Sequence, residues 1–203
     1  MTDAATPLRD RLDRLISLYE AAYRQTGEAD WRVRLGAPLS DDDLDRVENR
    51  IGRLLPKEAR DLYLWHDGCV PWIAPTISFN PLAVVAGFYT PSADFGLHNL
   101  TNAQGGALHP AALFTVLNID TVTFSVLTTT DDRAPVSGLY ASLFADLVDI
   151  TMIAHSIRGL VEHLIGEFEA GNIEYTEHGV RWTRDVFSWF RQKMEPFGEP
   201  ITG

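Results

Sequence analysis

The sequence predicts an α+β domain in which helices come first, a mainly antiparallel sheet follows, and a further helical part packs on that sheet. Three observations support this order. Apolar residues recur at helical spacing through the first third of the chain, β-branched and aromatic residues concentrate between residues 113 and 144, and helical spacing returns after Ser156. This order differs from the regular alternation of strands and helices that predicts a parallel sheet.

The first helix is predicted over residues 8–23, with one apolar side and one charged side. The stretch from Thr26 to Asp30 then breaks the helical spacing, and Trp31 and Val33 alternate with arginines as in a short strand. The apolar side of the helix consists of Leu8, Leu12, Leu15, Ile16, Tyr19, Ala22 and Tyr23.

A second helix is predicted to begin after Ser40. Ser40 and Asp43 have the spacing of a capping box, and the macrodipole favours further carboxylates in the first turn. Glu48 lies beside the apolar face of this helix and leaves two alternatives open: a flanking carboxylate that reaches solvent, or a partly buried acceptor that needs backbone or basic donors. The apolar face consists of Leu44, Val47, Ile51 and either Leu54 or Leu55.

A third, short helix is predicted to have Pro56 at its first position, where the missing amide has no intrahelical partner. Leu62 and Trp65 supply its buried side. Gly68 follows as the closing turn, because glycine adopts a positive φ at low steric cost.

The middle of the chain is rich in proline, and no regular element is assigned to the segment around residues 82–89. The polar run at 91–110 is predicted to be a long irregular loop. Strands are predicted at residues 113–119, 122–129 and 136–144, the first two forming a hairpin.

Ser156 is predicted to cap the next helix, whose apolar spacing continues to Phe168 and stops at Gly171. The tail is predicted to form a small hairpin around Gly179 and then an aromatic amphipathic helix over residues 186–194 that packs back on the domain.

The segment from Trp31 to Gly68 resembles the N-terminal signature of the SUKH superfamily, which includes a fungal regulator of cell-wall synthesis and bacterial proteins that protect cells against toxins. That signature runs from a Pro-Leu-Ser start through an acidic helix to Leu-Pro and a final glycine. The segment at 154–165 resembles the closing part of the same domain. The residues that carry the signature are Trp31, Pro38, Leu39, Ser40, Leu44, Glu48, Ile51, Gly52, Leu55, Pro56, Tyr63 and Gly68.

The resemblance implies a SUKH-like single domain with its core in residues 31–170. The amphipathic helix in 1–30 precedes this core, and a C-terminal hairpin and helix extension in 171–203, which departs from the family pattern, is predicted to pack on it. The resemblance also implies a non-enzymatic protein-binding function. The leading hypothesis is a cytoplasmic immunity protein that neutralises a cognate toxin. The alternative is a regulatory or scaffold module of the same fold without a toxin partner.

The composition restricts the class of partner. The chain has 17 basic and 28 acidic residues, a net charge of −11, which argues against nucleic acid or an anionic membrane and favours a basic protein such as a nuclease-type toxin. The single Cys69 excludes an internal disulfide and fits a reducing cytoplasm. The start of the chain has no pattern of an export signal, and no window approaches the roughly 20 apolar residues of a membrane span.

Acidic residues outside the apolar pattern are the candidate partner-binding residues. They could form one negative face that steers a basic partner, although helix capping and solubility are the favoured explanation for those near Ser40 and an equal alternative for the others. These residues are Asp41, Asp42, Asp94, Asp131, Asp132, Asp146 and Asp149.

An enzyme is the third hypothesis, because His66 and Asp67 lie beside the thiol of Cys69. A metallophosphohydrolase needs several further ligands, and neighbouring side chains on a chain point in different directions, so a helix-terminal turn is the favoured interpretation. The same reasoning favours a solvated surface pair for His163 and Glu167, and exposed loop positions for His98 and His109. We therefore predict no catalytic residue, no metal site and no cofactor.

Overall fold

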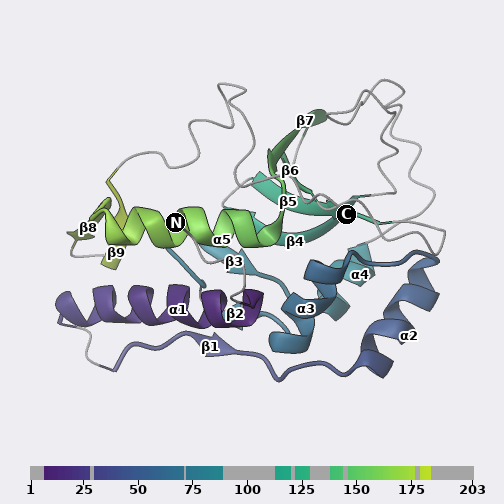
Figure 1. The fold of residues 1–203 in the computed structure, drawn as a ribbon, viewed down its shortest axis with the longest axis horizontal. Helices are drawn as coiled ribbons and strands as arrows, with labels where there is room; N and C mark the ends of the chain where they lie inside the picture. Colours follow the sequence, from purple (N-terminus) through teal and green to yellow (C-terminus); the bar gives the residue numbers. More distant parts are fainter. Residues whose placement is uncertain are drawn as a thin grey trace.

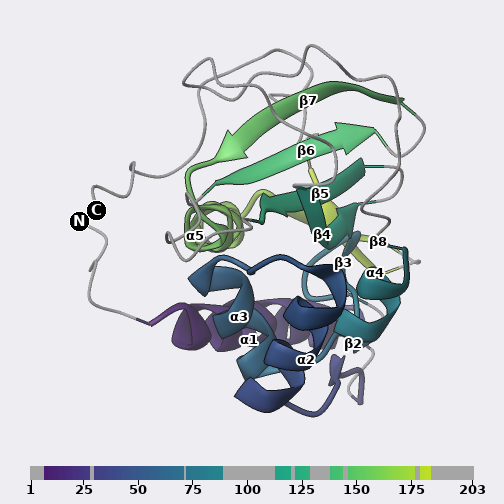
Figure 2. The same cartoon turned by 90° about the vertical axis from the view of Figure 1, so that its right-hand side faces the viewer.

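The computed structural model describes residues 7–27, 30–70, 72–88, 113–119, 122–128, 138–143, 146–176 and 179–183, and it confirms the α+β class. Figures 1 and 2 show helices α1, α2 and α3 gathered on one side of the molecule and the sheet extending away from them. The elements are α1 (Leu8–Gln25), β1 (Arg34–Leu35), α2 (Asp41–Ile51), α3 (Lys57–Trp65), β2 (Cys69–Val70), β3 (Ile77–Phe79), α4 (Leu82–Phe88), β4 (Leu113–Ile119), β5 (Val122–Leu127), β6 (Leu139–Leu143), β7 (Asp146–Ala154), α5 (Ile157–Glu169), β8 (Ile173–Thr176) and β9 (Gly179–Trp182).

The predicted helix boundaries near the N-terminus are close to those observed. Both halves of the capping box form at Ser40 and Asp43, and α2 ends at Gly52 in the left-handed region with φ of 67°. One detail was wrong: Pro56 is the residue before α3 and not its first helical residue, with an extended backbone at ψ of 152°. Its carbonyl still accepts the first helical bonds, from Ala59 and Arg60.

The main sheet has the order β3-β4-β5-β6-β7, and every neighbouring pair is antiparallel. Neither β3 nor α4 was predicted, because elements of three and seven residues are too short for helical and strand periodicity to be distinguished. Strand β7 was not predicted either, since Asp146 and Asp149 interrupt its apolar pattern. The predicted loop at 91–110 and the predicted helix at 186–194 lie outside the described residues.

One continuous core joins the helices to the sheet. It includes buried side chains from α1, α2, α3, α4 and α5 and from the strands. Helices α1 and α5 lie side by side (Figure 1) and are joined by ion pairs between Arg11 and Glu162, at 3.0 Å, and between Arg14 and Glu169. The apolar side of α1 that the sequence predicted is buried in the same core as α5.

The predicted hairpin around Gly179 forms as β8 and β9 and contacts α1. Gly179 has φ of 115°, and a Cβ placed there would lie 2.4 Å from the Tyr23 hydroxyl oxygen of α1. Trp182 donates its ring N–H to the Pro75 carbonyl at 3.1 Å and packs edge-on against Phe168. These contacts pack the hairpin against α1 and α5.

Thr76 is the only non-glycine residue with positive φ among the described residues, at 65°. It is exposed, in the turn between Ala74 and Ile77 that leads into β3. A β-branched residue in this conformation is strained by roughly 1–2 kcal/mol, which glycine would not be. We expect Thr76→Gly to raise the free energy of unfolding by about 1 kcal/mol, measured by urea denaturation.

The matched control is Thr26→Gly, at a position with φ of −81° where the threonine hydroxyl donates to the Tyr23 carbonyl. That substitution should lower stability, because it removes a hydrogen bond and relieves no strain. Equal effects of the two substitutions would contradict the assignment of strain to Thr76.

Candidate functional site

The first turn of α2 carries the densest group of carboxylates among the described residues. Asp43 is committed to the helix cap: its side chain accepts from the Ser40 backbone amide at 3.0 Å and from the Ser40 hydroxyl at 2.6 Å, and it also pairs with Arg46. The hydrogen bonds from Ser40 hold the pKa of the Asp43 carboxyl below its usual range. Asp41 and Asp42 are exposed on the same turn.

Arg60 of α3 lies among three carboxylates of α2. Its guanidinium contacts Asp41 at 2.9 Å and Asp45 at 3.0 Å, and it pairs with Glu48. Asp41 and Asp45 are exposed, whereas the Glu48 side chain is only 6% exposed. One cation is thus shared by three anions, so the surface formed by Asp41, Asp42 and Asp45 keeps a negative excess; we call these three residues the α2 acidic surface.

Glu48 is a buried acceptor, which is the second of the two alternatives that the sequence left open. One carboxylate oxygen accepts from the Leu55 backbone amide at 2.7 Å and the other from Arg60. The Glu48 backbone carbonyl also accepts from Gly52 and Arg53. Both oxygens are satisfied inside the fold, so Glu48 joins the end of α2 to α3 and has a structural role.

Neither Arg60 nor Asp45 was predicted as a site residue from the sequence. A carboxylate beside an apolar helix face signals that a donor is needed, but five basic residues follow Arg34 before Leu62, and only the packing of α2 on α3 selects Arg60.

The other predicted acidic residues do not join the α2 acidic surface. Asp146 and Asp149 belong to β7, at the far edge of the sheet, while α2 lies at the opposite end of the molecule in Figures 1 and 2. Asp94, Asp131 and Asp132 lie outside the described residues. The described elements that carry predicted acidic residues therefore lie apart in the fold: β7 is an edge strand of the main sheet, and α2 packs among the helices.

His66, Asp67 and Cys69 each have a different structural partner. The His66 ring Nδ1 lies 2.7 Å from the Gly36 carbonyl oxygen, which requires Nδ1 to carry the proton. The Asp67 carboxylate accepts from the Leu82 amide at the start of α4, at 2.6 Å. Gly68 has φ of 85° and packs directly against Pro81. These contacts connect the turn after α3 to the chain after β1 and to the start of α4. The three residues therefore lie in a helix-terminal turn, which was the favoured interpretation of the sequence.

The Cys69 thiol is buried, and its sulfur accepts from the Phe79 amide at 3.3 Å. Burial raises the pKa of the Cys69 thiol to about 11. We expect iodoacetamide at neutral pH to alkylate the folded protein far more slowly than the urea-unfolded protein, measured by mass spectrometry. Equal rates in the two states would show that the thiol is accessible.

His163 and Glu167 are not the solvated surface pair that the sequence predicted. Glu167 is buried, and its carboxylate accepts from the Asn172 side chain at 2.8 Å, while His163 Nε2 lies 3.9 Å from its other oxygen. The prediction failed because the last turn of α5 is covered by other parts of the fold, which a single-helix pattern cannot reveal. Among the described residues, no three His, Cys, Asp or Glu side chains are placed to hold a metal ion.

Glu58 of α3 is a half-buried carboxylate that was not predicted from the sequence. It accepts from the Ile157 amide at 2.7 Å, while Ser156 accepts from Gly159, so the start of α5 is capped both from α3 and from its own N-cap. Burial raises the pKa of the Glu58 carboxyl above its ordinary value, against the opposing effects of the Ile157 amide and Arg158.

This shift gives a pH dependence with a defined sign. A pKa raised by folding means that the contribution of Glu58 is greatest below its unfolded pKa and is lost as pH rises through the folded pKa. We expect the stability of the wild type relative to Glu58→Gln to fall across that window, measured by urea denaturation at a series of pH values. Parallel stability curves for the two proteins would contradict it.

Comparisons with known proteins assign no family. No model of a protein family matches the chain, and no curated protein matches it. No helix in the described residues is both long enough and apolar enough to cross a membrane.

Proposed function

We propose that this chain is a protein-binding domain of the SUKH type that acts in the cytoplasm as an immunity protein and neutralises a basic, nuclease-type toxin. The residues that resemble the SUKH signature support the family part of this proposal. The net charge of −11 supports the choice of a basic partner, because a protein with a large negative charge attracts cations and repels nucleic acid.

The observation that carries the proposal is the α2 acidic surface. Asp41, Asp42 and Asp45 are exposed, and Arg60 is shared between two of them and the buried Glu48. Asp42 forms no ion pair within the described residues. Exposed carboxylates of this kind accelerate association with a cationic partner and contribute specificity more than raw affinity.

The test is protection and binding with the toxin domain encoded beside this gene. Coexpression of the chain should restore growth of cells that produce the toxin, and the purified proteins should form a complex. Asp42→Lys should lower the association rate constant by about tenfold at low salt, measured by stopped-flow fluorescence, with a smaller effect at high salt.

Asp30→Lys is the matched control, since it makes the same charge change at an exposed position in the turn after α1. If both variants slow association equally, overall charge and not the α2 acidic surface guides binding. If the chain neither binds nor protects, the immunity proposal is wrong. Specific binding of a cellular protein without any toxin partner would instead favour the regulatory or scaffold alternative.

A further inference from the structure

Strands β1 and β2 form a separate two-stranded ribbon whose two faces differ in burial. The register pairs Arg34 with Val70 and Leu35 with Cys69. Cys69 faces the core, as does Val33, the residue before Arg34; each is 9% exposed, whereas Val70 is 64% exposed. Successive side chains on a strand point to opposite faces, so the face that carries Arg34 and Val70 is the outer one.

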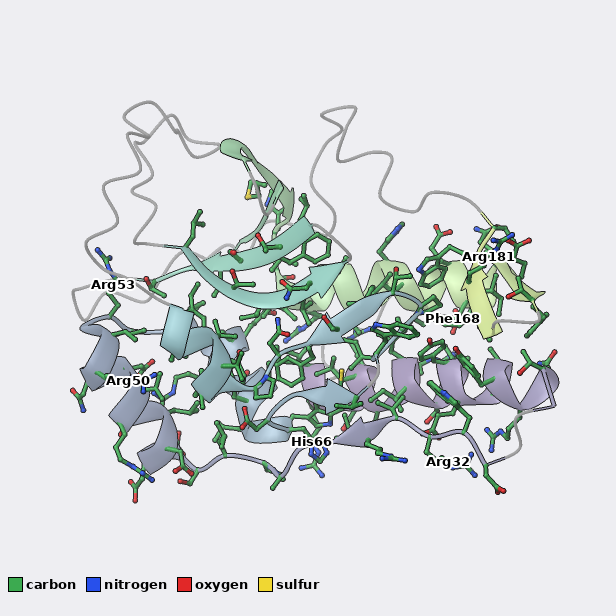
Figure 3. The ribbon with its side chains drawn as sticks, turned by 180° about the vertical axis from the view of Figure 1, so that it is seen from behind. Arg32, Arg50, Arg53, His66, Phe168 and Arg181 are labelled. Carbon is green, nitrogen blue, oxygen red and sulfur yellow. The ribbon has the colours of Figure 1, made fainter. Side chains whose placement is uncertain are left out.

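Two further exposed residues are near this pair in the chain. Arg32 lies two residues before Arg34, which places both on the same face of an extended chain, and Trp72 lies two residues after the end of β2. Both are exposed, the Arg32 side chain at 50% and Trp72 at 38%. We call Arg32, Arg34, Val70 and Trp72 the ribbon patch. Figure 3 shows Arg32 at the edge of the molecule along which β1 runs.

The ribbon patch has the chemistry of a protein interface. Tryptophan and arginine are enriched among the residues that contribute most to binding, because they combine a large apolar surface with directed hydrogen bonds. Arg34 has no acidic partner among the described residues, and Arg32 lies 3.9 Å from Glu20. Two exposed guanidinium groups therefore lie beside two exposed apolar side chains, in a chain whose net charge is strongly negative.

We propose that the ribbon patch is a docking surface for an acidic segment of another protein, with carboxylates over Arg32 and Arg34 and apolar side chains over Val70 and Trp72. Arginine binds carboxylates through two parallel hydrogen bonds, which supplies orientation as well as attraction. This goes beyond the proposed immunity function, because the partner has the opposite charge and the surface lies on different elements.

A second copy of the chain fits the ribbon patch less well. Two ribbon patches facing each other would bring arginines against arginines. A contact between the ribbon patch of one copy and the α2 acidic surface of the next would join two different surfaces, so it would close into a dimer only if the same contact formed twice about a twofold axis. Nucleic acid could stack on Trp72, but it carries a phosphate charge at every nucleotide, which the net charge of −11 repels along its whole length, whereas a short acidic segment needs only the few carboxylates that pair with Arg32 and Arg34.

The test is a titration of the full chain against a fluorescein-labelled peptide built from the repeat Glu-Leu-Glu, followed by fluorescence anisotropy at low salt. The wild type should bind saturably, and Arg34→Glu and Trp72→Ala should each weaken binding by about tenfold or more. The matched control is Arg50→Glu, an exposed arginine of α2 that Figure 3 places at the opposite end of the molecule from Arg32; it should retain binding.

Several results would overturn the proposal. These are a lack of saturable binding with correctly folded protein, checked by circular dichroism, and an equal loss of binding in Arg50→Glu. Tighter binding of an oligothymidylate that depends on Arg34 would identify nucleic acid as the ligand. A dimer in sedimentation that Arg34→Glu dissociates would identify a second copy. None of these results depends on whether the chain protects against a toxin.

Discussion

Replacing Arg60 with methionine is expected to lower the free energy of unfolding by about 3 kcal/mol, because Arg60 is the basic partner of the buried Glu48. Methionine keeps the apolar stem of arginine but removes the guanidinium. The Leu55 backbone amide is then the remaining hydrogen-bond donor to the buried Glu48 carboxylate. An uncompensated buried charge is costly, because its interaction with water is lost and nothing replaces it. Urea denaturation with linear extrapolation measures the change.

Asp45→Asn is the matched control, since it removes an exposed partner of the same guanidinium. Exposed ion pairs contribute roughly 0–1 kcal/mol, so this variant should be nearly as stable as the wild type. The double variant Glu48→Gln with Arg60→Met should recover part of the loss, because it removes the buried charge itself. Equal losses in Arg60→Met and Asp45→Asn would contradict the structural role assigned to Glu48.

Replacing Gly36 with alanine is expected to destabilise the protein by about 3 kcal/mol or more. A Cβ at this position would lie 2.0 Å from the Asp67 carbonyl oxygen, which is backbone and cannot rotate away. The same region is held by hydrogen bonds from the Gly36 amide to Gly68, at 3.0 Å, and from the Asp67 amide to Ala37, at 3.2 Å. Relief of the clash would therefore break the connection between β1 and the turn after α3.

Gly166→Ala is the matched control, because Gly166 lies within α5 and nothing is within 4 Å of the Cβ position. Alanine is favoured over glycine in a helix by roughly 0.5–1 kcal/mol, so this variant should gain stability. Thermal unfolding followed by circular dichroism would measure both changes. A Gly36→Ala protein as stable as the wild type would show that the two segments separate without cost.

Features that depend on neighbouring residues were predictable. Ser40 and Asp43 are three residues apart, so the capping box could be recognised from their spacing, and the same holds for Ser156 with α5. The hairpin around Gly179 and the strands β4 and β5 follow from local patterns of β-branched residues and turns. Short or interrupted elements such as β3, α4 and β7 were missed because their patterns are not distinctive.

The candidate surfaces depended on contacts between distant residues. Glu48 could be identified as a carboxylate in need of donors, but its pairing with Arg60 spans 12 residues and two helices. Acidic residues that composition groups together come from elements that are separated in space, since Figure 2 shows α2 and β7 on opposite sides of the molecule. A count of charged residues contains no information about their position. It therefore predicted the sign of a partner's charge and not the surface at which that partner binds.

The sequence by itself determined the α+β class, the helix caps, the acidic character and the alternation of arginines with apolar residues near Trp31. Only the tertiary structure decided which of these residues share a surface. Arg34 and Val70 are 36 positions apart, and they became one patch because the register of β1 with β2 puts both on the same face. Local spacing follows from the geometry of a single element, whereas a surface requires the packing of several.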